Sequence, residues 1–95
     1  HIWHVIFSYN RSKISKKFRN CIDVIAGSIG LVYPTCYAYH FDSKHVHCHM
    51  VISATPFLPA PEPLTGTNLA NYITIKMNSS GFTFDINDEG GFLNV

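Results

Sequence analysis

Residues 37–52 place the strongest constraint on the fold, because apolar side chains there occupy alternate positions on both sides of a short polar segment. The apolar positions are Tyr37, Tyr39, Phe41, Val46, Cys48, Met50 and Ile52. A period of two is typical of a β-strand that buries one face. The polar segment contains Ser43 and Lys44, where a tight turn can reverse the chain. The pattern predicts a hairpin of two antiparallel strands, residues 31–41 and 46–54, with one face in a core.

The other face of this hairpin is polar and rich in histidine. It carries Ala38, His40, Asp42, His45, His47 and His49, and so holds four of the six histidines of the chain. For a turn at residues 43 and 44, the predicted cross-strand pairs are Asp42 with His45, Phe41 with Val46, His40 with His47, and Ala38 with His49. A slip of one residue would bury the imidazoles and expose the aromatic rings, so the pattern fixes the register.

Further strands and helices flank the hairpin. Residues 1–9 alternate like a strand, residues 12–29 repeat apolar side chains at helical spacing, and residues 68–77 favour a second helix. The segment TPFLPAPEPL, with four prolines, predicts a loop. A C-terminal hairpin is expected to turn at residues 88–91. The order β-α-β-β-α-β with a trailing strand predicts an α+β fold of the ferredoxin-like, split-βαβ type. In this fold an antiparallel sheet carries both helices on one face and the histidines on the other.

Length and composition favour one globular domain covering residues 1–95. Hydrophobic residues make up 46% of the chain and charged residues 14%, which is typical of a folded domain. We find no apolar run of membrane-spanning length and no signal peptide, and expect an intracellular, cytoplasmic protein that does not bind membranes. The three cysteines lack CxxC spacing, so we expect small core residues rather than disulfides or cysteine ligands of zinc. The chain starts directly in a strand, and we expect it to be trimmed at its N-terminus.

The histidine face predicts a metal site. Imidazoles of His40, His47 and His49 come from paired or alternate positions on one face, where they can converge on a single ion. Neutral imidazoles suit Zn²⁺, and a site with three protein ligands and open positions can also hold Mn²⁺ or Mg²⁺ next to phosphate oxygens. Asp42 and His45 are placed to orient a ligand imidazole through its second nitrogen. His4 either faces the same site or is simply exposed.

The segment HFDSKHVHCH resembles the third motif of plasmid mobilisation relaxases. These enzymes belong to the HUH endonucleases, which nick single-stranded DNA and share a histidine, bulky apolar, histidine sequence. The relaxase motif is commonly H-x-D-x-x-N-x-H-x-H, and the matching residues are His40, Asp42, His47 and His49. His45 stands where asparagine is usual. Upstream, HVIFSY is similar to the relaxase motif in which a strand ends in Ser-Phe, with Ser8 at the DNA-contacting position. The resemblance covers about residues 1–54.

The resemblance implies metal-dependent nicking and rejoining of single-stranded DNA in plasmid mobilisation or rolling-circle replication. A tyrosine attacks the scissile phosphate, and the metal, held by His40, His47 and His49, stabilises the charge that develops on it. Five of the seven cations lie within nine residues after the first strand: Arg11, Lys13, Lys16, Lys17 and Arg19. On this reading the DNA-binding residues are Ser8, Arg11, Lys13, Lys16 and Lys17. Accessory proteins of a mobilisation or replication complex are expected partners.

The nucleophile is the point at which the sequence departs from the relaxases. Relaxases carry their tyrosine before the first strand, and this sequence begins within that strand. Replication initiators and single-tyrosine transposases carry theirs on a helix after the histidine motif, where Tyr72 in NYITIK is the candidate. Tyr72 fits equally well as a packing aromatic residue.

Two other functional classes fit parts of the sequence. His45 to Val51 also follow the H-φ-H-φ-H-φ-φ pattern of histidine-triad nucleotide hydrolases and transferases, in which His47 would attack an α-phosphate without metal. That reading gives His40 and Asp42 no role. The third class is a non-catalytic, metal-bound module that binds single-stranded nucleic acid. Dependence on a divalent metal separates the first class from the second.

Overall fold

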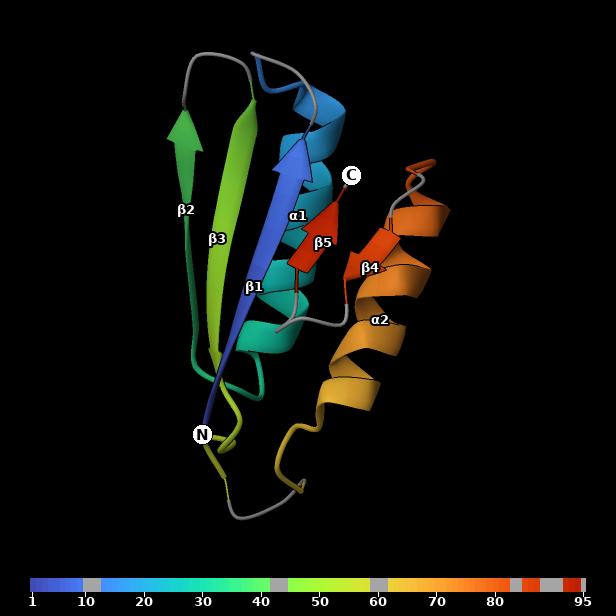
Figure 1. The fold of residues 1–95 in the computed structure, drawn as a ribbon. Coiled ribbons are helices and arrows are strands. Elements are labelled where there is room, and N and C mark those ends of the chain that lie inside the picture. Colours follow the sequence, from blue (N-terminus) through green and yellow to red (C-terminus); the bar gives the residue numbers. More distant parts are fainter. Residues whose placement is uncertain (10–12, 42–44, 59–61, 83–84, 88–91, 95) are drawn as a thin grey trace.

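The computed structural model describes residues 1–9, 13–41, 45–58, 62–82, 85–87 and 92–94. Within these residues the chain forms an α+β domain whose elements follow the order β1 (Ile2–Tyr9), α1 (Lys16–Gly30), β2 (Thr35–Phe41), β3 (Val46–Ser53), α2 (Gly66–Ser79), β4 (Asp85–Asn87) and β5 (Phe92–Asn94). The strands form one sheet in the order β2-β3-β1-β5-β4. Both helices lie behind this sheet in the view of Figure 1.

The three long strands form the antiparallel part of the sheet. β3 lies in the middle and pairs with β2 on one side and β1 on the other, antiparallel to both. Three of the predicted hairpin pairs are present: Phe41 with Val46, His40 with His47, and Ala38 with His49. The fourth pair, Asp42 with His45, and the turn at residues 43 and 44 lie outside the described residues. The alternation of apolar side chains therefore predicted the register, and the predicted core face is buried along β3. In the edge strand β2 the prediction of a buried face was wrong for Tyr37 and Phe41, which are 38% and 55% exposed.

The far edge of the sheet departs from the predicted antiparallel order. β5 pairs with β1 in parallel, and β4 lies outside β5 and pairs with it antiparallel. The sheet as a whole is therefore mixed. β4 and β5 form the predicted C-terminal hairpin, whose turn at residues 88–91 lies outside the described residues. Because β5 and not β4 meets β1, the strand that follows α2 forms the sheet edge.

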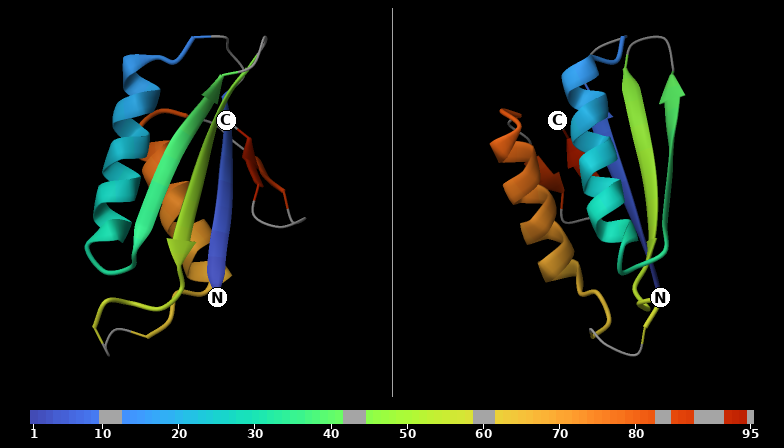
Figure 2. Two further views of the ribbon diagram at one scale, coloured as in Figure 1. Left: turned by 90° about the vertical axis from the view of Figure 1, so that its left-hand side faces the viewer. Right: turned by 180° about the vertical axis from the view of Figure 1, so that it is seen from behind.

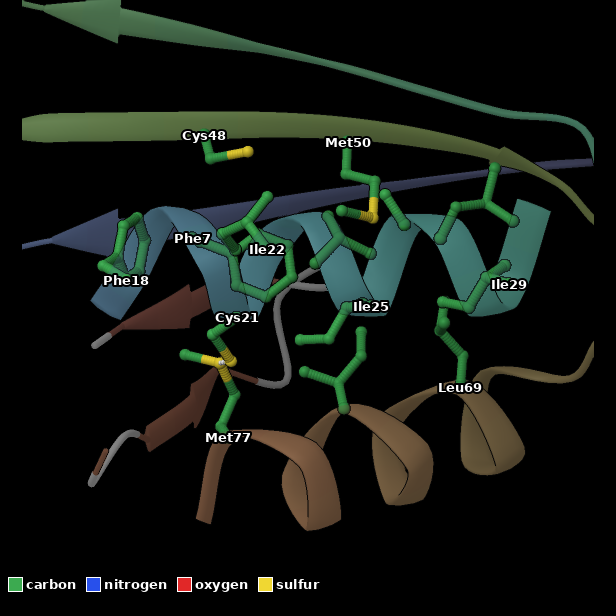
Figure 3. Packing of buried hydrophobic residues seen from close by; sticks show 14 residues of the cluster. Phe7, Phe18, Cys21, Ile22, Ile25, Ile29, Cys48, Met50, Leu69 and Met77 are labelled. Carbon is green, nitrogen blue, oxygen red and sulfur yellow. Dashed lines mark hydrogen bonds between the residues drawn. The ribbon is translucent and has the colours of Figure 1, made fainter. Parts of the chain in front are cut away.

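The core lies between the sheet and the two helices. Side chains that alternate along β1 and β3 meet the apolar faces of α1 and α2, as Figure 3 shows for Phe7, Met50, Ile22 and Leu69. The buried hydrophobic residues are Val5, Phe7, Phe18, Cys21, Ile22, Ile25, Ala26, Ile29, Val46, Cys48, Met50, Ile52, Ala54, Leu69, Ile73 and Met77. Figure 2 shows from two further sides that both helices lie on the same side of the sheet, with α1 against the long strands and α2 beside α1. The opposite face of these strands carries no helix among the described residues.

The first helix begins later than the sequence predicted. Residues 13–15 are not helical, and Ser15 is the N-cap, its hydroxyl accepting a hydrogen bond of 3.0 Å from the amide of Phe18. This is the capping geometry that serine favours, because the hydroxyl satisfies an amide without a partner in the helix. The predicted start at residue 12 was wrong, since two serines precede the apolar repeat and only the second forms the cap.

The second helix is longer than predicted at both ends. Thr65 is its N-cap and accepts a hydrogen bond from the amide of Asn68. At the other end, Gly81 has φ +83°, and the amides of Gly81 and Phe82 donate to the carbonyls of Asn78 and Met77. These two bonds form a Schellman motif, which ends a helix with a glycine in the left-handed conformation.

The cysteines do not share one environment. Cys21 and Cys48 are buried, as expected, but Cys36 is exposed. The prediction of three core cysteines was therefore wrong for Cys36, which pairs with Val51 on the face of the sheet away from the helices. Neither helix in the described part of the chain has the length and apolar character needed to cross a membrane.

Candidate functional site

The open face of the sheet brings the predicted histidines into neighbouring rows. His47 pairs with His40 of β2 on one side and with Ser8 of β1 on the other. In the next row, His49 lies between Ala38 and Ile6. Because side chains at paired positions point to the same face, these residues share one surface. The structure thus places Ser8, which belongs to a separate sequence motif, beside the three histidines that were predicted to share one ion.

The imidazole rings of the predicted ligands lie near one another without meeting at one point. The centroid of His40 is 6.4 Å from that of His47 and 6.3 Å from that of His49. His45, just before β3, has its ring 6.3 Å from that of His47. Two imidazoles bound to one tetrahedral ion, with metal–nitrogen bonds of about 2.1 Å, would have centroids about 5 Å apart.

The donor types fit a divalent metal, but the present ring positions do not form a completed site. Among the described residues, no three His, Cys, Asp or Glu side chains are grouped closely enough to hold an ion. The His40 ring would need to approach those of His47 and His49 by about 1 Å, which side-chain rotation on fixed strands can supply. The backbone register therefore suits a three-histidine site, while the imidazole rings lie farther apart than they would around a bound ion.

His4, for which the sequence left open whether it faces the site, lies on this face beside His49. Its Nε2 atom lies 3.1 Å from Nδ1 of His49, within hydrogen-bond distance, and the ring centroids are 5.3 Å apart. His4 pairs with Val51, so it reaches His49 diagonally across two strands. The alternation of β1 placed His4 on the same face as Ser8, but the contact depends on how β1 is aligned with β3.

The surroundings of His49 favour its neutral form. Burial lowers the pKa of His49, and the nearby imidazoles of His4, His40 and His47 lower it further. A neutral imidazole keeps a lone pair for a metal ion or for a hydrogen bond. Cys48, between the two histidines of the strand, points the other way into the core, and burial raises the pKa of its thiol to about 12. The thiol therefore stays protonated and takes no part in this face.

The five tyrosines of the sequence all lie within the described residues, and none is on the histidine face. Tyr9 stacks on Phe18, and Tyr33 donates to the carbonyl of Glu62. Tyr37 donates to a carboxylate oxygen of Asp23, which raises the pKa of Tyr37. Burial raises the pKa of Tyr39.

Tyr72, the candidate nucleophile, lies in α2 on the opposite side of the sheet from the histidines. Its ring packs against the core, and its hydroxyl is buried with no hydrogen-bond partner among the described residues. The structure therefore does not bring Tyr72 together with His40, His47 and His49.

The predicted DNA-binding residues are divided between the two sides of the sheet. Ser8 lies beside His47 on the open face. Lys16 and Lys17 lie in the first turn of α1, on the helix side, where they line a cleft between α1 and α2. Lys13 is exposed just before α1. Arg11 and Asp42 lie outside the described residues.

Comparison with known proteins gave no relatives for this chain. No family model matches the sequence, and neither the curated proteins nor the solved structures contain a significant match. The resemblance to relaxases therefore depends on the residues of the motif and on their arrangement.

Proposed function

We propose that this chain is the metal-binding and DNA-binding part of an HUH-type endonuclease that nicks and rejoins single-stranded DNA in the cytoplasm. The observation that carries the proposal is the row formed by His40, His47 and Ser8 across three adjacent strands. This row joins the two relaxase-like motifs, which are more than thirty residues apart in the sequence, at one place on an open sheet face.

The arrangement of the first three strands supports the same proposal. β1 and β2 run in the same direction with β3 between them, and α1 connects β1 to β2 across one face. This is the split-βαβ arrangement that we assign to the fold. It leaves the second face open, so an extended DNA strand can lie across the histidines without displacing a helix.

In this proposal His40, His47 and His49 hold a divalent ion, with Mn²⁺ or Mg²⁺ preferred and Zn²⁺ a further possibility. When bound, the ion supplies positive charge that stabilises the phosphate oxygens during transfer. The protein contributes neutral imidazoles, of which His49 is kept neutral by burial and by its neighbours. Ser8 offers a hydroxyl beside His47 that can donate to a phosphate oxygen.

The attacking tyrosine would have to come from outside residues 1–95, because the five tyrosines in this sequence lie away from the histidine face. This agrees with the place of the tyrosine in relaxases, before the first strand, and not with its place in replication initiators. Tyr72 is therefore assigned a packing role.

The test combines metal binding with DNA cleavage. The purified chain is titrated with Mn²⁺ by calorimetry, and incubated with labelled single-stranded oligonucleotides from its own replicon, with and without EDTA. We expect Mn²⁺ binding that is weakened at least about tenfold in His47→Ala. The matched control is His1→Ala, which removes an exposed histidine whose ring lies against Trp3 and not on the histidine face, and which should keep Mn²⁺ affinity. Failure to bind Mn²⁺, or equal affinity in His47→Ala, would contradict the proposal.

Gel analysis of the same incubations locates the nucleophile. A covalent DNA adduct that is lost in Tyr72→Phe would overturn the packing role of Tyr72. Metal-dependent DNA binding without an adduct is the result expected for residues 1–95 alone.

The histidine-triad function is retained as a second candidate, because the described histidines do not form a metal site as they stand. In addition, Nε2 of His4 lies 3.1 Å from Nδ1 of His49, so one imidazole can orient its neighbour by a hydrogen bond. Hydrolysis of a nucleotide substrate in EDTA, lost in His47→Ala, would favour this candidate over the endonuclease.

A further inference from the structure

A second polar site lies on the helix side of the molecule, between the first half of α1 and the end of α2. It is a cleft of about 560 Å³ lined by Lys16, Lys17, Asn20, Cys21, Val24, Lys76, Ser79 and Ser80. Cys21 closes its floor, where its sulfur lies 3.4 Å from that of Met77 (Figure 3). The cleft therefore sits directly above the contact between the two helices, and the sheet separates it from the histidine face.

The charged side chains that line this cleft, among the described residues, are all positive. Three lysines from two helices line it, and neither acidic side chain that the structure describes, Asp23 or Glu62, is among the lining residues. Lys16 and Lys17 occupy the first turn of α1, which contains no acidic residue. The positive end of the helix dipole repels cations at that position. In the folded chain these positive charges therefore repel one another, and a bound anion would offset that repulsion.

Two of the ammonium groups are held in place by aromatic rings. The Nζ atom of Lys17 lies 5.0 Å from the centroid of Phe82, and that of Lys76 lies 5.6 Å from the centroid of Tyr72. Such contacts favour a lysine cation over a ring face. They reduce the conformational entropy that Lys17 and Lys76 would lose on binding a ligand.

The lysines are not needed to cap α2. The carbonyls of Lys76, Met77 and Asn78 already accept hydrogen bonds from the amides of Ser80, Phe82 and Gly81. The Ser79 hydroxyl also donates to the Lys76 carbonyl. Because these acceptors are occupied, the ammonium groups remain available to a ligand. Asn20 and Ser80 add polar groups of the kind that bind phosphate oxygens.

We propose that this cleft binds phosphate groups, without a metal and independently of the histidine face. Its volume lies within the range of small-ligand sites and accommodates a phosphate with part of a nucleotide. The phosphate can belong to a nucleic-acid backbone or to a free anion, since both present the same oxygens to lysine. The inference does not depend on the proposed nicking activity.

The test is a nuclear magnetic resonance titration of the whole chain in EDTA, first with inorganic phosphate and then with a dodecamer of thymidine. We expect backbone signals of Asn20, Ser79 and Ser80 to shift and saturate, and the triple variant Lys16→Gln, Lys17→Gln, Lys76→Gln to lose these shifts. Two single variants that each remove one cation give a charge-matched comparison. Lys17→Gln should weaken the shifts, while Arg19→Gln should retain them, because Arg19 lies over the Tyr39 ring and not in the cleft. Shifts with phosphate alone indicate a free anion, and shifts with the dodecamer alone indicate a nucleic-acid backbone.

Salt dependence measures how many lysines contact the polymer. For single strands, the logarithm of the binding constant falls with that of salt concentration by about 0.7 per phosphate neutralised. The triple variant should therefore reduce the slope for the dodecamer by about 2. A slope unchanged in the triple variant, with no phosphate-induced shift in the cleft, would overturn the proposal.

A second pair of variants adds a carboxylate without removing any lysine. Ser79→Glu places it among the cleft lysines, while Asn78→Glu places it on an exposed neighbour that does not line the cleft. We expect Ser79→Glu to abolish phosphate binding and Asn78→Glu to retain it. Equal losses in the two variants would show a nonspecific charge effect and contradict the assigned site.

Discussion

The histidine face shows which residue contacts a sequence can and cannot specify. His40, His47 and His49 share a face because strand side chains alternate, and this follows from spacing alone. The contact between His4 and His49 depends on the alignment of β1 with β3, two strands separated by a helix and another strand. No local pattern encodes that alignment, so His4 could be placed only on a face and not beside a particular imidazole.

The lowered pKa of His49 predicts a pH dependence of stability in metal-free protein. Between the lowered value and the usual value of about 6.5, the unfolded chain binds more protons at His49 than the folded chain does. The His49 contribution to stability is therefore complete above about pH 6.5 and is lost as the pH falls through the lowered pKa. Urea unfolding from pH 7.5 to pH 5 in EDTA should show this loss, and His49→Asn should reduce it.

A titration of the imidazole signals tests the cause of this shift. Burial is the larger cause and His4 the next, so His4→Asn should raise the pKa of His49 only part of the way to its usual value. A wild-type His49 that titrates at or above 6.5 would contradict the prediction.

Tyr72 supplies a second prediction for a single residue. Its buried hydroxyl has no hydrogen-bond partner among the described residues, and burying an unsatisfied hydroxyl costs about 1–3 kcal/mol. Tyr72→Phe removes that hydroxyl and keeps the ring in the core, so we expect a free energy of unfolding that is unchanged or about 1 kcal/mol higher. Denaturant unfolding measures it. A loss of more than about 1 kcal/mol would show that the hydroxyl is bonded after all.

Among the secondary-structure elements, local sequence signals predicted the presence of both helices better than the residues at which they begin and end. The serine cap and the glycine after α2 are both visible in the sequence, yet two serines compete for the start of α1. The parallel pairing of β5 with β1 could not be predicted from the sequence, for a different reason. This pairing depends on which of two adjacent short strands lies next to β1, and both are three residues long.

Replacing a helix glycine with alanine should change the free energy of unfolding in opposite directions at two positions, one inside α1 and one just after α2. Gly27 lies within α1 and has open space where an alanine Cβ would lie, so Gly27→Ala should stabilise the protein by about 0.5–1 kcal/mol. Gly81 has φ +83°, where a Cβ is unfavourable, so Gly81→Ala should destabilise it by about 1–2 kcal/mol. Thermal and urea unfolding of both variants measure these differences.

The Gly81 result also tests the neighbouring side chain. A Cβ there would lie 2.8 Å from Nζ of Lys17, but this is the mobile end of a long side chain and can move aside. The backbone conformation is therefore expected to cause most of the loss. A destabilisation by Gly81→Ala that disappears in the Lys17→Gln background would show that the contact with Lys17, and not the backbone, is responsible.

Over the whole molecule, stability and candidate function occupy different faces of the sheet. The buried side chains lie between the sheet and the two helices, and the histidines lie on the other face. Sequence alternation could predict this division because it needs only the period of each strand. The position of the lysine cleft could not be predicted, since it depends on the packing of α1 against α2.

This division predicts that metal removal leaves the fold intact. Because the core contains none of the histidines, the chain in EDTA should keep its circular dichroism spectrum and a cooperative thermal transition. Added Mn²⁺ at a hundred times its dissociation constant should raise the free energy of unfolding by about 2.7 kcal/mol through binding to the folded state alone. His47→Ala should unfold like the wild type in EDTA and should lose most of the gain from Mn²⁺. Unfolding of the wild type in EDTA would instead indicate a metal-stabilised module, the third class that the sequence allowed, because only then would the ion replace core packing as the source of stability.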